Sequence, residues 1–181
     1  MFLEIVVPIS PEGWDEKKQE FVESETKTIR LIHSLVSISK WESKWHKPFL
    51  SSDLQPIEIL DYIKCMTITP NVDDSVYDHL TQQNIDEIRG YINDAMTATT
   101  FSGNGGGKRN REIVTSELIY YWMIALNIPS EYEKWHLNRL LTLIRVCNVK
   151  NTPPKKRSKK DTMSYYAELN RARRQQLNSK G

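Results

Sequence analysis

The chain has 181 residues, of which 39% are hydrophobic and 27% charged, a composition that allows one domain with a core plus an appendage and excludes a wholly disordered chain. Neither a signal peptide nor a run of the ~18 apolar residues that span a bilayer is present, so we expect a soluble, intracellular protein. The net charge of +2 is unevenly distributed, because residues 150–181 hold ten Lys or Arg against two acidic residues, a net +8, which leaves −6 for residues 1–149.

The N-terminal segment has the alternating, β-branched pattern of a strand. Residues 2–7 read Phe-Leu-Glu-Ile-Val-Val, and Pro8 and Pro11 interrupt the pattern. Two further extended stretches follow at 19–23 and 27–32. We therefore expect residues 1–33 to form a small antiparallel hairpin or three-stranded sheet that packs on the rest of the domain.

From Ser34 the apolar period changes to that of helices. The first helical stripe ends at Pro48, and Pro56 begins a second helix, for which Ser52 or Asp53 is the expected cap. A short helix is expected within residues 71–81, and a longer one from Thr81 to Met96. The pattern thus predicts several short helices in succession rather than one long coiled coil.

The second half of the helical region is divided by a glycine-rich segment. Residues 102–110 are expected to form an exposed, mobile loop. The helix that Thr115 or Ser116 caps is apolar nearly all round, which predicts a central, buried position. Ser130 is expected to cap one continuous helix over 131–147, and Asp161 to cap a last helix over 162–177.

These elements predict a mainly α (α+β) protein. We expect an N-terminal β element at 1–33, a helical bundle domain at 34–150 with its loop at 102–110, and a basic C-terminal arm at 151–181.

The sequence has no pattern typical of a catalytic or metal site. His33, His46, His79 and His136 have no His, Cys or acidic residue at metal-ligand spacing, and the glycine run around Gly107 lacks the spacing of a phosphate-binding loop. We therefore expect no enzyme, no cofactor and no metal.

Two groups of residues are candidates for partner binding. Trp41 and Trp45 lie one helical turn apart among lysines, which suits either core packing or an aromatic contact with a partner. The basic arm can neutralise phosphates, bind an acidic protein or remain solvated. Its candidate contact residues are Lys155, Lys156, Arg157, Lys159, Lys160, Arg171 and Arg174.

Most of the chain resembles a group of proteins of tailed phages and prophages. The resemblance is carried by the stretches 33–50 (His-Ser-Leu-Val-Ser-Ile-Ser-Lys-Trp-Glu-Ser-Lys-Trp-His-Lys-Pro-Phe-Leu), 61–69, 117–129 and 134–147 and by the ending Gln-Leu-Asn-Ser-Lys-Gly at 176–181. In size and layout the chain is similar to tail assembly chaperones of long-tailed phages, which are encoded just before the tape measure protein.

The resemblance implies that the chain binds the tape measure protein, helps tail tube subunits polymerise around it and acts in the host bacterial cytoplasm. We also expect that its helical body either self-associates into a homo-oligomer or coats an extended helical client. A protein of this family has no active-site motif and no membrane partner. The residues themselves leave two other functions open. One is a nucleic-acid-binding phage protein that uses the basic arm, and the other is a head–tail joining or tail completion protein that stays in the virion.

Overall fold

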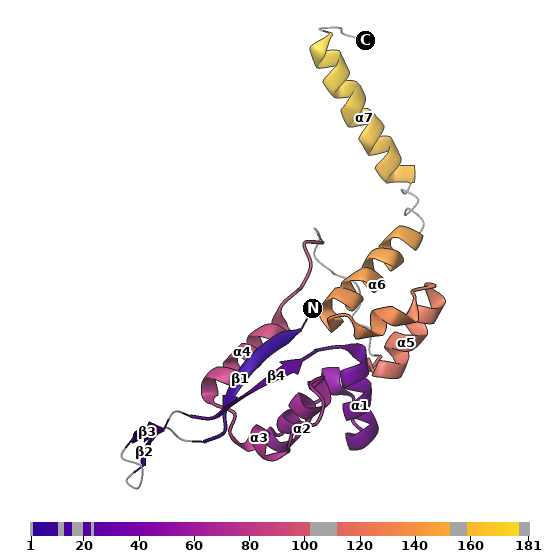
Figure 1. The fold of residues 1–181 in the computed structure, drawn as a ribbon. Helices are drawn as coiled ribbons and strands as arrows, with labels where there is room; N and C mark the ends of the chain where they lie inside the picture. The colour runs from indigo at the N-terminus through magenta and orange to yellow at the C-terminus, as the bar shows by residue number, and fades with distance from the viewer. Residues whose placement is uncertain are drawn as a thin grey trace. The chain divides into compact units, whose positions relative to one another are not determined.

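The computed structural model describes residues 2–10, 13–15, 20–22, 24–101, 112–152 and 159–177; for 13–15, 20–22 and 159–162 it describes the backbone. The chain divides into two compact units, residues 1–148 and 149–181. The described part is mainly helical with a small antiparallel β element at the N-terminus, which confirms the predicted fold class (Figure 1). No described helix is long and apolar enough to cross a membrane.

The N-terminal β element consists of two antiparallel ladders. Strand β1 (Leu3–Pro8) pairs with β4 (Thr26–Leu31), and β2 (Gly13–Asp15) pairs with β3 (Glu20–Val22). The two short strands lie between the long ones in sequence, so the element is a hairpin and not a three-stranded sheet. One side of the β1–β4 ladder is buried because apolar residues alternate along both strands. The buried residues are Ile5, Val7, Ile29 and Leu31.

Three short helices follow the hairpin. Helix α1 (Leu35–Trp45) is capped by Ser34, and a 3-10 turn, η1 (Phe49–Ser51), leads to α2 (Pro56–Met66) and α3 (Ser75–Asp78). Pro56 occupies the first turn of α2 as expected. Its cap is Gln55, whose backbone N–H donates to Glu58 Oε2 at 2.9 Å, so the expected caps Ser52 and Asp53 were wrong.

Helix α4 (Gln82–Asn93) is fixed at its N-terminus to the hairpin. Thr81 Oγ1 accepts a hydrogen bond from the Asn84 backbone N–H at 3.2 Å, and the Asn84 side chain donates to the Val6 carbonyl at 3.1 Å. The expected loop at 102–110 lies outside the described residues.

Helix α5 (Ser116–Ala125) corrects one prediction. Ser116, Ile119 and Met123 are buried, but Tyr121 is 62% exposed and Ile124 is 75% exposed. The helix packs on α1 with one side and presents an apolar side to solvent. The expected central position was wrong, since an apolar sequence does not decide how many neighbours a helix has.

The continuous helix expected at 131–147 is broken in two. A 3-10 helix, η2 (Ser130–Lys134), precedes α6 (Leu137–Asn151). At the break His136 pairs with Ser34 in a β-bridge, and the Leu137 N–H donates to the His33 carbonyl at 2.9 Å. These contacts with the start of α1 replace the helical hydrogen bonds that the sequence pattern predicts.

The second unit contains helix α7 (Lys159–Gln176). It begins before Asp161, so this residue lies within the helix and does not cap it.

The core of the first unit joins the buried side of the hairpin to α1, α2, α4, α5 and α6. Its buried helical members include Leu35, Ile38, Trp41, Tyr62, Ile63, Met66, Ile88, Tyr91, Ile119, Met123, Leu137, Leu140 and Ile144.

Candidate functional site: an apolar groove between two helices

A groove of about 360 Å³ lies between α2 and α4, and Phe49 of η1 is one of its lining residues. Eight of its ten lining residues are apolar, and the polar ones, Arg89 and Asn93, both come from α4. The apolar lining residues are Phe49, Leu54, Ile59, Tyr62, Ile63, Ile85, Ile88 and Ile92. An open surface of this composition is typical of a binding site for an apolar partner surface.

The floor and the walls of the groove differ in burial. Tyr62, Ile63 and Ile88 are buried and belong to the core, so they form a fixed floor. Ile59 on the α2 wall is 42% exposed, and Ile85 on the α4 wall is partly buried. A partner in the groove therefore gains apolar contacts with side chains that solvent otherwise reaches.

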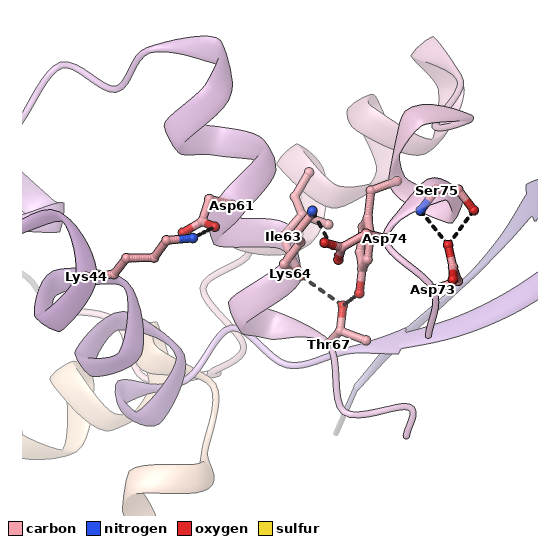
Figure 2. A network of polar contacts seen from close by, with 9 residues as sticks. Lys44, Asp61, Ile63, Lys64, Thr67, Asp73, Asp74 and Ser75 are labelled. Carbon is pink, nitrogen blue, oxygen red and sulfur yellow. Dashed lines mark hydrogen bonds and ion pairs between the residues drawn. The ribbon is translucent and has the colours of Figure 1, made fainter. Parts of the chain in front are cut away.

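Polar contacts hold the α2 wall against its neighbours (Figure 2). The Asp61 carboxylate accepts hydrogen bonds from Lys44 Nζ and, at 2.9 Å, from the Trp45 indole N–H, which ties α2 to α1. On the other side, Lys64 forms an ion pair with Asp74 at 3.1 Å. Burial alone would raise the pKa of Asp61, but the hydrogen bonds from Lys44 and Trp45 outweigh it and lower the pKa, so Asp61 is ionised at neutral pH.

Trp41 packs against Phe49, the residue of η1 that lines the groove. Its ring meets Phe49 edge-on at a centroid distance of 5.2 Å, and its indole N–H donates to the Glu58 carbonyl at 2.9 Å. Phe49 in turn packs on Tyr62 at 4.1 Å. Trp41 is fully buried, so in this structure it cannot contact a partner; for this residue the core-packing interpretation holds and the partner-binding one is corrected.

Glu42 fixes the position of Phe49. Its carboxylate is buried and accepts hydrogen bonds from the Phe49 N–H at 2.8 Å and the Ser116 N–H at 2.7 Å. One side chain of α1 therefore holds both the groove-lining residue Phe49 and the first turn of α5, where a carboxylate also interacts favourably with the helix dipole.

A buried cluster of histidine and tyrosine includes Tyr62, which also lines the groove. Tyr62 Oη and His33 Nδ1 are 2.5 Å apart, and the rings of His33 and His136 lie 5.0 Å apart. His136 Nε2 lies 3.0 Å from the Tyr91 carbonyl. Burial and the nearby His136 lower the pKa of His33 to about 3, and burial lowers the pKa of His136, so both rings are neutral at pH 7. With the rings enclosed, their role is to fix Tyr62 at the floor.

The described residues contain no group of three or more His, Cys, Asp or Glu side chains that could hold a metal ion. The lining of the groove itself offers an apolar surface with one cation, Arg89.

Trp45, the other predicted site residue of the first unit, is not among the residues that line the groove. Trp45 is partly buried and bonded to Asp61, and Arg171 and Arg174 are exposed on α7 in the second unit. The backbone of α7 includes Lys159 and Lys160. Lys155, Lys156 and Arg157 lie outside the described residues.

No pattern in the sequence predicted the groove. The available signal was that apolar residues occur on more than one side of α2, since Ile57 and Ile59 are exposed while Tyr62 and Ile63 are buried.

Comparisons of the chain with family models, with curated proteins and with solved structures found no match.

Proposed function

We propose that the protein is a non-enzymatic phage tail assembly chaperone, which binds the tape measure protein and promotes assembly of the tail tube around it. The observation that supports this proposal most is the apolar groove between α2 and α4. The resemblance of the sequence to phage tail proteins supplies the identity of the client.

The shape and lining of the groove suit an amphipathic helix. The largely aliphatic walls formed by α2 and α4 can accept a third helix whose apolar residues recur at every third or fourth position. A long tape measure chain exposes such helices before the tail tube covers it. Shielding them in a groove prevents their aggregation and needs no chemical step.

Co-purification with the tape measure protein tests the proposal. The wild-type chain should retain the tape measure protein, whereas Ile59→Glu should lose most of it, because the substitution places a charge on the apolar α2 wall. Since Ile59 is part-exposed, we expect Ile59→Glu to cost no more than about 1 kcal/mol of folding stability.

Ile57→Glu is the matched control. Ile57 lies on the same helix, is 63% exposed and does not line the groove, so this variant should retain the client as the wild type does. Failure of the wild type to retain the tape measure protein would contradict the proposed function. Equal retention by Ile59→Glu would contradict the groove as its site.

A second candidate function is nucleic-acid binding by the basic arm. It is favoured by Arg171 and Arg174, which lie three residues apart on α7 and are both exposed. Binding of this kind weakens steeply as salt increases, and it should disappear when both arginines are replaced by glutamine. A gel-shift titration of the full chain at two salt concentrations distinguishes it from client binding in the groove.

A further inference from the structure

The exposed side of α5 is apolar where a surface helix is usually polar. The buried residues Ser116, Ile119 and Met123 lie on one side of the helix, and helical periodicity places Glu117, Tyr121, Ile124 and Ala125 on the opposite side. All four of these are exposed, and only Glu117 is charged. We call this set the α5 outer face. A contiguous apolar face of this kind marks an interaction surface.

Carboxylates border the α5 outer face. Glu117 is on the face itself, one turn before Tyr121, and hydrogen bonds from its own backbone N–H and from Thr115 lower its pKa, so it is ionised. Glu133 accepts a hydrogen bond from Tyr120 Oη at 3.0 Å, and Tyr120 precedes Ile124 by about one helical turn. Residues 112–134 carry four glutamates and one lysine, a net −3. The fitting occupant is therefore apolar and basic.

Helix α7 has this chemistry. Residues 159–177 carry five Lys or Arg and two acidic residues, a net +3. Periodicity places Tyr166, Leu169 and Arg173 on one side of the helix, three and four residues apart, with Arg171 on the opposite side. Along this side of α7 the order is aromatic (Tyr166), aliphatic (Leu169) and cationic (Arg173). In an antiparallel arrangement this order matches the α5 outer face, because the cation meets the acidic Glu117 and the two apolar residues meet Tyr121 and Ile124.

We propose that the α5 outer face binds helix α7 of a second copy of the chain, with Arg173 paired to Glu117 and Tyr166 and Leu169 packed on Tyr121 and Ile124. Reciprocal exchange of the two arms closes a two-fold dimer, because each copy supplies one face and one helix. The charge complementarity selects α7, and the two matched apolar sides supply the buried area. This surface is separate from the α2–α4 groove, so the proposal does not depend on the proposed function.

Sedimentation equilibrium of the full chain tests the dimer. The wild type should show a concentration-dependent dimer. Ile124→Asp should weaken dimerisation by at least about tenfold, since it buries a charge in the apolar contact. The side chain is exposed in the single copy, so the fold should tolerate it. Ile57→Asp, an exposed apolar residue on α2, is the control and should leave the dimer unchanged.

A charge exchange tests the pairing. Glu117→Arg and Arg173→Glu should each weaken the dimer several-fold, and the variant that carries both should recover most of the wild-type affinity. Arg171→Glu makes the same change of charge on the other side of α7 and should affect the dimer less than Arg173→Glu does.

Three results would overturn the proposal. The wild type could be monomeric at every concentration, which is also the result expected if α7 binds within its own chain. The dimer could persist in Ile124→Asp. The double charge variant could show no recovery over the single ones. Circular dichroism of each variant establishes that its fold is intact. Co-purification of the tape measure protein is measured separately, so failure of the dimer proposal can be distinguished from failure of the proposed chaperone function.

Discussion

Single buried polar residues fix the parts of the first unit to one another. Glu42 is the clearest case, because its two carboxylate oxygens accept the backbone N–H groups of Phe49 and Ser116, which are far apart in sequence. A buried N–H group without an acceptor costs about 1–3 kcal/mol. The position of η1 and of the start of α5 thus depends on one side chain.

We expect Glu42→Ala to lower the free energy of unfolding by about 2–4 kcal/mol, since both N–H groups lose their acceptor. Glu42→Gln should cost less, because its amide oxygen still accepts one of the two hydrogen bonds. Urea denaturation measures the difference. Ser43→Ala, at an exposed neighbouring position, should change stability by no more than about 0.5 kcal/mol. Equal stability of wild type and Glu42→Ala would show that Glu42 has no anchoring role.

The buried histidines make stability dependent on pH. Burial and His136 lower the pKa of His33 to about 3 in the folded chain, whereas an unfolded histidine has a pKa near 6.5. Between these values the unfolded state binds more protons than the folded state. The free energy of unfolding should therefore fall as the pH falls below about 6.5, by up to about 1.4 kcal/mol per pH unit for His33 alone.

Denaturation curves recorded at a series of pH values test this expectation. His33→Gln cannot titrate, so its stability should decrease less steeply with falling pH than that of the wild type. His79→Gln is the control, because His79 is exposed and its removal should leave the slope unchanged. A wild-type slope that His33→Gln does not alter would show that His33 is not the titrating group.

At the scale of elements, the caps and the tertiary hydrogen bonds decide where helices begin. Asn84 belongs both to the cap of α4 and to the contact of α4 with β1. The helix that forms one wall of the groove is therefore placed by a residue at its own first turn.

Asn84→Ala should lower the free energy of unfolding by about 1–2 kcal/mol, because it removes the side chain from the cap and its hydrogen bond to the Val6 carbonyl. Gln83→Ala, at the preceding exposed position, serves as control and should have an effect of no more than about 0.5 kcal/mol. Thermal unfolding of the two variants makes the comparison. A larger loss in Gln83→Ala than in Asn84→Ala would contradict the anchoring of α4 to β1.

Periodicity and proline positions predicted most of these elements. The stripe of α1 and the start of α2 at Pro56 are local features, and the structure has them as expected. The break before α6 was not predictable, because it depends on the pairing of His136 with Ser34, about a hundred residues away. The exposure of one side of α5 was not predictable either, because the neighbouring elements of the fold, and not the composition of the helix, determine how far it is buried.

At the scale of the whole molecule, the mainly α class with an N-terminal hairpin followed from the sequence, and the groove did not. The groove forms only if α2 and α4 lie across from each other in the fold. A local sequence pattern does not determine how two helices separated in sequence are placed. Trp41 is a second feature that the sequence pattern left open. Its position one helical turn from Trp45 is compatible both with the core and with a surface contact. Only the packing on Phe49 decides between them.

The proposed chaperone function links these scales. Glu42, Asn84 and the histidine cluster fix the groove, α2 and α4 supply its walls, and a client helix would complete the apolar layer between them. In this account the client does not use the basic arm or the α5 outer face, which serve the proposed contacts between two copies of the chain.

Hydrogen exchange of the chain with and without the tape measure protein tests this account most directly. Binding in the groove should slow exchange at the backbone amides of α2 (Pro56–Met66) and α4 (Gln82–Asn93), with little change in α7. Protection confined to α7, or no protection anywhere in the chain, would contradict it.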